Sequence, residues 1–296
     1  MDKVMRRTAA WVLWSAMAGL SFAAWAGVKE VRQQIEGSML VTGYTYIEPD
    51  GSVGRLELDQ PEKLPPAVKT LVERAGTEWQ FEPVMVDGVA RRAKARMSLR
   101  VVAKKVSEDS YQIALRGAYF GEEAMTPDER IALEDESTIR PNHLKPPLYP
   151  APAAQMGARG TVYVVLRIGR DGKVEDAIAE QINLQIVGRE KQMDYMRNVL
   201  SKSALTAAKD WSFKPPTQGP MAAEPYWVVR VPVDYSMHGD KVPGYGEWDA
   251  YVPGPRQEVP WRTGELAPGE TPDAMIAGGF YPVGRGLRLR TPLQSG

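Results

Sequence analysis

Side chains that could perform catalysis or bind a metal are few and far apart in this sequence of 296 residues. The two histidines, His143 and His238, have no cysteine and no suitably spaced ligand beside them, so we expect no metal site. A Gly-x-Ser-x-Gly nucleophile motif and the glycine-rich motifs of nucleotide binding do not occur. The acidic residues at 129–136 are typical of a solvated helix face. We therefore expect neither an enzyme nor a protein with a small-molecule cofactor.

One pattern occurs twice and gives the chain its organisation. An Asp-Gly turn at 50–51 is followed by Trp-x-Phe-x-Pro at 79–83, and an Asp-Gly turn at 171–172 is followed by Trp-x-Phe-x-Pro at 211–215. The aromatic spacing is identical although the surrounding surface residues differ, which favours a structural role over ligand contact. The expected core aromatics are Trp79, Phe81, Trp211 and Phe213.

The elements around the first copy predict a hairpin, a helix and a strand. Residues 38–47 and 52–58 flank the first Asp-Gly turn, and a helix begins at Pro66 with apolar residues at spacings of three and four. Residues 93–101 then alternate apolar side chains with Lys94, Arg96, Ser98 and Arg100, so we expect one buried and one solvent-facing side.

The second copy repeats this order. Strands are predicted at 161–168, 173–180 and 226–235, with a helix between the last two whose apolar stripe consists of Met193, Met196, Leu200, Ala204, Ala207 and Trp211. The predicted fold class is α+β, with two small units that each hold a three-stranded antiparallel sheet and a packed helix in the order β-β-α-β.

The remaining segments complete the expected domain organisation. Lys3, Arg6 and Arg7 precede an uncharged run that ends in Ala24-Trp25-Ala26, which predicts an export signal cleaved after Ala26; an uncleaved inner-membrane anchor is the alternative. The 37 basic and 37 acidic residues balance, so no nucleic-acid partner is expected. The expected divisions are a signal peptide at 1–26, a degenerate unit at 27–106, a linker with a short helix at 107–140, a second unit at 141–236 and an irregular Pro/Gly-rich tail at 237–296.

The second unit resembles the carboxy-terminal domain of the TonB family of energy transducers. The resemblance rests on Pro-Leu-Tyr-Pro at 147–150, Gly157 and Gly160, Asp-Gly-Lys-Val at 171–174, the alanine-rich helix end before Trp211, and Val-Val-Arg-Val-Pro-Val-Asp-Tyr at 228–235. It implies a periplasmic protein of a Gram-negative bacterium and a link to transmembrane transport. The first unit lacks the Tyr-Pro pair and resembles the family through the internal repeat.

The resemblance also implies a binding mode, in which the final strand offers an open edge to an extended segment of an outer-membrane receptor or another envelope protein. The expected partner-binding residues are Tyr226, Val228, Val229, Arg230, Val231, Val233 and Asp234. Strand addition of this kind obtains affinity from backbone hydrogen bonds and specificity from alternate side chains. Pro232 cannot donate such a bond.

Two functions remain open from the sequence. The first is a periplasmic adaptor that binds an extended partner segment. The second is a structural envelope protein that uses the same edges for self-association, for example as a homodimer, without binding a receptor. Force transmission is less expected, because the hydrophobic run looks cleavable and a folded unit begins soon after it.

Overall fold

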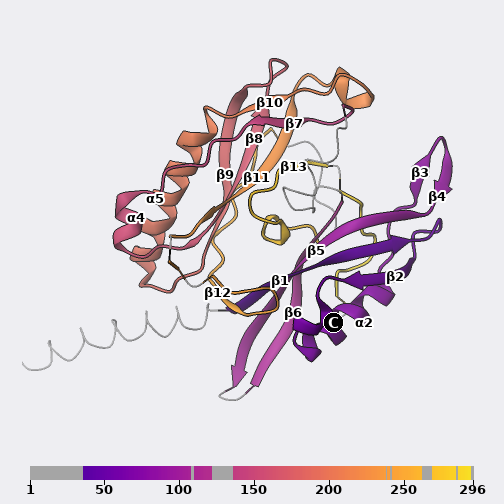
Figure 1. The fold of residues 1–296 in the computed structure, drawn as a ribbon, viewed down its shortest axis with the longest axis horizontal. Helices are drawn as coiled ribbons and strands as arrows, with labels where there is room; N and C mark the ends of the chain where they lie inside the picture. The colour runs from indigo at the N-terminus through magenta and orange to yellow at the C-terminus, as the bar shows by residue number, and fades with distance from the viewer. Residues whose placement is uncertain are drawn as a thin grey trace, which may run out of the picture.

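The computed structural model describes residues 36–107, 110–121, 136–237, 239–240, 242–261, 269–284 and 286–294. The fold is mixed α+β and is built mostly from antiparallel sheets with few helices (Figure 1). The expected signal segment and most of the acidic helix at 129–136 lie outside the described residues. Of the described helices, none is both long and apolar enough to cross a membrane.

The first part of the chain forms a sheet with a helix on one face. Its elements are β1 (Glu36–Ile47), β2 (Val53–Leu58), η1 (Pro61–Lys63), α2 (Pro66–Glu78), β3 (Val84–Val86), β4 (Val89–Arg91), β5 (Ala93–Ser107) and β6 (Ser110–Phe120). Strand β1 pairs with β5 along its whole length, and its other edge pairs with β2. Strand β6 extends the sheet beyond β5, so residues of the expected linker belong to this sheet.

The second sheet contains, in spatial order, β13 (Tyr281–Pro282), β11 (Trp227–Tyr235), β8 (Gly160–Ile168) and β9 (Val174–Leu184). Its region contains β7 (Arg140–His143), α4 (Ala151–Gln155), β8 (Gly160–Ile168), β9 (Val174–Leu184), α5 (Glu190–Ala208), β10 (Ser212–Lys214), η3 (Pro220–Ala223) and β11 (Trp227–Tyr235). Strand β9 is longer than expected because it continues to Leu184. The buried stripe of α5 ends with Ala208, where the sequence pattern suggested Ala207, which is only half-buried.

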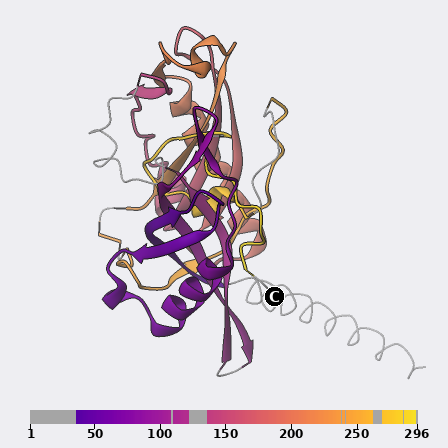
Figure 2. The same cartoon turned by 90° about the vertical axis from the view of Figure 1, so that its right-hand side faces the viewer.

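The carboxy-terminal segment connects the two sheets. It contains β12 (Asp249–Tyr251), η4 (Pro272–Ala274) and β13 (Tyr281–Pro282), and in Figures 1 and 2 its yellow chain lies among the violet and pink elements. Strand β12 pairs with β1 of the first sheet, and the next residue, Val252, bridges to Leu184 of the second. The segment expected to be an irregular tail is therefore part of both folded regions.

The face of β5 expected to be exposed is largely covered. Ser98 is fully buried and Arg96 is 6% exposed, while the Arg96 guanidinium pairs with Asp59 at 2.7 Å. Arg100 donates from Nε to the carbonyl of Asp273 at 2.8 Å. The expectation of a solvent-facing side was wrong because the alternating pattern carries no information about distant segments that cover it.

The two Asp-Gly turns have the same geometry. Gly51 has φ +87° and Gly172 has φ +77°, and each carbonyl accepts a hydrogen bond at 2.8 Å from the following phenylalanine N–H, of Phe81 and Phe213 respectively. A Cβ on either glycine would lie 2.1 Å from the carbonyl oxygen of that same phenylalanine. The turn thus fixes the Trp-x-Phe-x-Pro segment against the hairpin.

Replacing Gly172 with alanine is expected to destabilise the protein by more than about 2 kcal/mol, since the left-handed backbone alone costs about 1–2 kcal/mol and the Cβ would also clash. Gly88→Ala is the matched control, because Gly88 has φ +75° but no heavy atom within 4 Å of the added Cβ. Urea denaturation measures both. Equal losses in the two variants would contradict the close approach of Gly172 to Phe213.

Candidate functional site: the outer edge of strand β11

Strand β11 is anchored along its inner edge by β8. The pairing is antiparallel from Trp227↔Ile168 to Tyr235↔Gly160. On one face of the strand, the side chains of Trp227, Val229, Val231, Val233 and Tyr235 are buried in the core beneath α5. The outer edge and the opposite face are therefore the parts of β11 that can contact other segments.

The outer edge is filled by the chain's own tail. Strand β13 pairs with β11 at Val229↔Pro282 and Arg230↔Tyr281. The Val283 N–H donates to the Val228 carbonyl at 2.9 Å, and the Gly278 N–H donates to the Pro232 carbonyl at 3.1 Å. The expectation of an open edge was wrong over this stretch, because an extended segment from the same chain already occupies it.

Pro232 fits this geometry. Its carbonyl faces the tail, so the missing N–H also faces outward and no hydrogen bond to β8 is lost. By the same alternation, the backbone groups of Val229 and Val231 face β8, whereas those of Val228 face the outer edge. Substitutions meant to block the edge must therefore target Val228, since proline at 229 or 231 would break the sheet itself.

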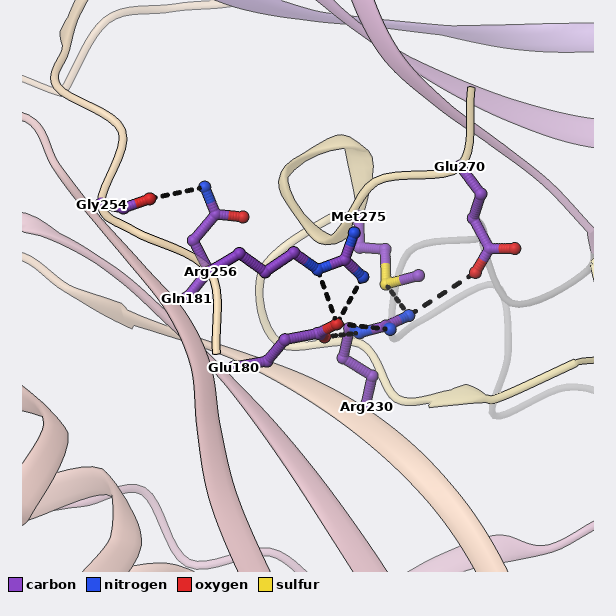
Figure 3. A network of polar contacts seen from close by, with 7 residues as sticks. All are labelled: Glu180, Gln181, Arg230, Gly254, Arg256, Glu270 and Met275. Atoms are coloured by element: carbon purple, nitrogen blue, oxygen red, sulfur yellow. Dashed lines mark hydrogen bonds and ion pairs between the residues drawn. The ribbon is translucent and has the colours of Figure 1, made fainter. Parts of the chain in front are cut away.

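A buried ionic cluster lies on the face of β11 opposite the core (Figure 3). Arg230 is 1% exposed at its side chain and Glu180 of β9 is 0% exposed, and Arg230 donates from Nε to Glu180 Oε2 at 2.6 Å. Arg256 of the tail donates from Nε to Glu180 Oε1 at 3.0 Å. Glu270 and Met275, also from the tail, contact Arg230 Nη1 at 3.6 and 3.7 Å.

The cluster attaches the tail to the second sheet through charge. Burial raises the pKa of Glu180, but its ion pairs with Arg230 and Arg256 outweigh burial and hold the pKa below its usual value. Glu180 is thus kept ionised by one arginine of the sheet and one of the tail. We name this group, Glu180, Arg230, Arg256 and Glu270, the charge latch.

The remaining predicted edge residues lie at the two ends of β11. Tyr226 and Val228 are half-buried and line a cavity of about 420 Å³, which Val283 and Gly284 also line. The tail leaves the β11 edge there, at Gly284 with φ +84°. At the other end Asp234 is exposed and accepts a hydrogen bond from the Thr161 hydroxyl at 3.0 Å.

The predicted core aromatics are all buried, from 0% exposed for Phe81 to 4% for Phe213. The indole N–H of Trp211 donates to the Lys145 carbonyl at 2.8 Å, and that of Trp79 donates to the Leu293 carbonyl at 2.8 Å. One acceptor lies shortly before strand β8 in sequence, whereas the other lies close to the carboxy-terminal end of the described residues. Sequence reasoning did not identify this second partner.

No cluster suited to metal binding occurs among the described residues. His143 is exposed on β7, and His238 lies outside the part of the chain that the structure describes. What the structure brings together is an extended backbone edge, an internal segment seated on it, and a charge latch that holds this segment. That arrangement can bind peptide backbone.

Comparison with known proteins found no matching family model, no matching curated protein and no matching solved structure.

Proposed function

We propose that this chain is a periplasmic binding or adaptor protein of the TonB type, which engages an extended segment of an outer-membrane protein by strand addition at β11. The observation that carries the proposal is the antiparallel tail segment on the outer edge of β11. The site holds an extended chain by backbone hydrogen bonds, which is the interaction that strand addition needs. A link to transmembrane transport belongs to the same proposal.

The strand order supports two related β-β-α-β units. In each sheet the first strand is central, its hairpin partner lies on one side, and the next long strand after the helix lies on the other: β2-β1-β5 and β9-β8-β11. The matching turns at Gly51 and Gly172 add a second correspondence. We interpret the chain as two copies of one unit, of which the second carries the partner-binding edge.

The tail segment is a replaceable occupant of this edge. Strand β13 has two residues, and its flanks add the Val283 and Gly278 hydrogen bonds. A typical hydrogen bond contributes about 1 kcal/mol net. A partner segment that pairs along the whole outer edge of β11 would form more bonds than the tail does, so it can compete once the tail is loosened.

The test uses substitutions that loosen the tail or block the edge. Val283→Pro removes the donor to Val228 and is expected to raise capture of an outer-membrane protein about fivefold, since about 1 kcal/mol of tail docking is lost. Val283→Ala keeps the donor and is the matched control. The proteins are immobilised and exposed to detergent-solubilised Gram-negative outer membranes, and captured proteins are quantified by mass spectrometry.

Adding Val228→Pro to Val283→Pro is expected to abolish the extra capture, because the edge can no longer donate at this position. Capture that is the same in all these variants would place binding elsewhere and defeat the proposal.

Self-association is the second candidate function. Strand β2 pairs with β1, and the described residues supply no strand for its outer edge. An unpaired edge is a template for pairing with another chain. Light scattering on the same variants separates the candidates: a concentration-dependent dimer without receptor capture would favour the structural role.

A further inference from the structure

The first unit contains a groove that is filled by the last described residues of the chain. The Glu82 N–H donates to the Arg288 carbonyl at 2.9 Å, and the Arg290 N–H donates to the Gln80 carbonyl at 2.7 Å. On the other side of the groove, the Leu287 N–H donates to the Phe120 carbonyl of β6 at 2.7 Å. Residues 287–290 thus lie between 80–82 and β6, and the segment continues along β6 to Gln294, whose side-chain oxygen accepts from the Leu115 N–H at 2.8 Å.

Two leucines of this segment fill the apolar floor of the groove. Leu289 is 2% exposed and Leu293 is 7% exposed, and both belong to the core of the first unit. In that core Phe120 packs edge to face against Trp79 and Phe81, with ring centroids 5.2 and 4.9 Å apart. The segment is therefore recognised by side chains four residues apart as well as by backbone.

The second unit has a counterpart of this groove with a different occupant. There β10 pairs with β7, and the indole N–H of Trp211 donates to Lys145. That occupant comes shortly before β8, the first long strand of the same unit, whereas the occupant of the first unit comes from the far end of the chain. The first unit therefore accepts a segment that is remote in sequence, as a receptor accepts a peptide.

We propose that the groove of the first unit is a second peptide-binding site, whose outside ligand is an extended partner segment with two aliphatic side chains four residues apart beside a basic residue. The tail supplies this chemistry as an internal ligand: Leu289 and Leu293 fill the floor, and Arg288 Nε lies 3.5 Å from Glu82 Oε1. The site needs no receptor at β11, so it stands independently of the proposed function.

The tail occupies both sites at once, with residues 278–283 on β11 and 287–294 on the first unit. Linked binding segments compete at an effective concentration in the millimolar range. An outside segment therefore gains access to one site more easily after the tail has left the other. Two copies of the chain that exchanged tail segments would form the same contacts that each copy already forms with its own tail. Exchange between copies therefore adds no binding free energy.

The experiment removes the internal ligand and supplies it as a peptide. A chain that ends at Gly284 keeps β13 but lacks the groove occupant, and the probe is a fluorescent synthetic peptide of residues 286–294. We expect saturable binding by fluorescence anisotropy, together with a shift of the Trp79 indole N–H resonance. A peptide with Leu289→Asp and Leu293→Asp is the control, and it is expected to bind at least about tenfold more weakly, because it would place two charged side chains where two leucines are buried.

Each outcome decides the proposal. The shortened chain could be unfolded on its own. In that case the site is supported if the wild-type peptide makes the chain fold and the aspartate peptide does not, because ligand binding stabilises the folded state. A folded chain that does not bind the peptide, an unfolded chain that the peptide does not rescue, or equal binding of both peptides would overturn it. A dimer of the full-length chain through its carboxy-terminal segments would overturn the assignment to an outside partner.

Discussion

Replacing Glu180 with glutamine is expected to lower the free energy of unfolding by about 3–5 kcal/mol, the usual cost of breaking a buried ion pair by removing one partner. Arg230 would remain 1% exposed with only Glu270, at 3.6 Å, as a carboxylate neighbour, and Arg256 of the tail would lose its ion pair with β9. This loss of stability has two sources. The buried charge of Arg230 is poorly compensated, and the tail is held less firmly. Chemical denaturation followed by circular dichroism measures it.

A control on the same strand is Glu175→Gln. Glu175 pairs with Arg167 at 3.1 Å, but its side chain is 47% exposed, so the expected loss is below about 1 kcal/mol. A double variant with methionine at both Glu180 and Arg230 is expected to recover part of the stability, because it leaves neither member of the pair as a lone buried charge. Similar losses of stability for Glu175→Gln and Glu180→Gln would show that the charge latch stabilises the protein no more than an exposed ion pair does.

The pH dependence gives a separate readout of the same group. The pKa of Glu180 is held below its usual value in the folded protein. Its contribution is therefore fully present above the unfolded pKa and is lost as the pH falls through the folded pKa. We expect Glu180→Gln to reduce the slope of stability against pH in this acid range. An unchanged slope would contradict the role of Glu180 as an ionised anchor of the tail.

The local elements could be predicted from the sequence because their patterns are local. The hairpin around Gly51, helix α2 and strand β8 follow from turn residues, from spacings of three and four, and from alternation. The repeat of Trp-x-Phe-x-Pro identified aromatic positions that the structure buries. These inferences need only the residues within each element.

The outer edge of β11 could not be predicted in the same way. Strand β13 has two residues, lies among glycines and prolines, and pairs with a strand that is distant in sequence, so it has no periodic pattern to detect. The sequence predicted Arg230 as a partner-binding residue of this edge, whereas the structure buries its side chain. Its partners come from β9 and the tail, and only the folded chain brings them together. A single arginine between valines is the one local sign of this burial.

Replacing Trp211 with alanine is expected to destabilise the protein by about 3–5 kcal/mol, as for other large-to-small changes in a packed core. Trp211 is 3% exposed, and its loss would leave a cavity and an unpaired Lys145 carbonyl. Trp211→Phe keeps most of the ring volume and is expected to cost less, because it removes mainly the hydrogen bond. Trp248→Ala is the exposed control, since Trp248 is 37% exposed.

The effect of Trp211→Ala is expected to reach the first sheet, because the tail contributes to both hydrophobic cores. Val252 and Phe280 lie in the core that packs against the second sheet, and Leu289 and Leu293 lie in the core of the first sheet. When the second unit opens, its contacts with the tail are lost, and the groove occupant of the first unit is then held at one site instead of two. Hydrogen exchange of the β5 amides should therefore become faster in Trp211→Ala. If the β5 amides of Trp211→Ala exchanged as slowly as in the wild type while the α5 amides exchanged faster, the two sheets would unfold independently. The tail would then not couple them.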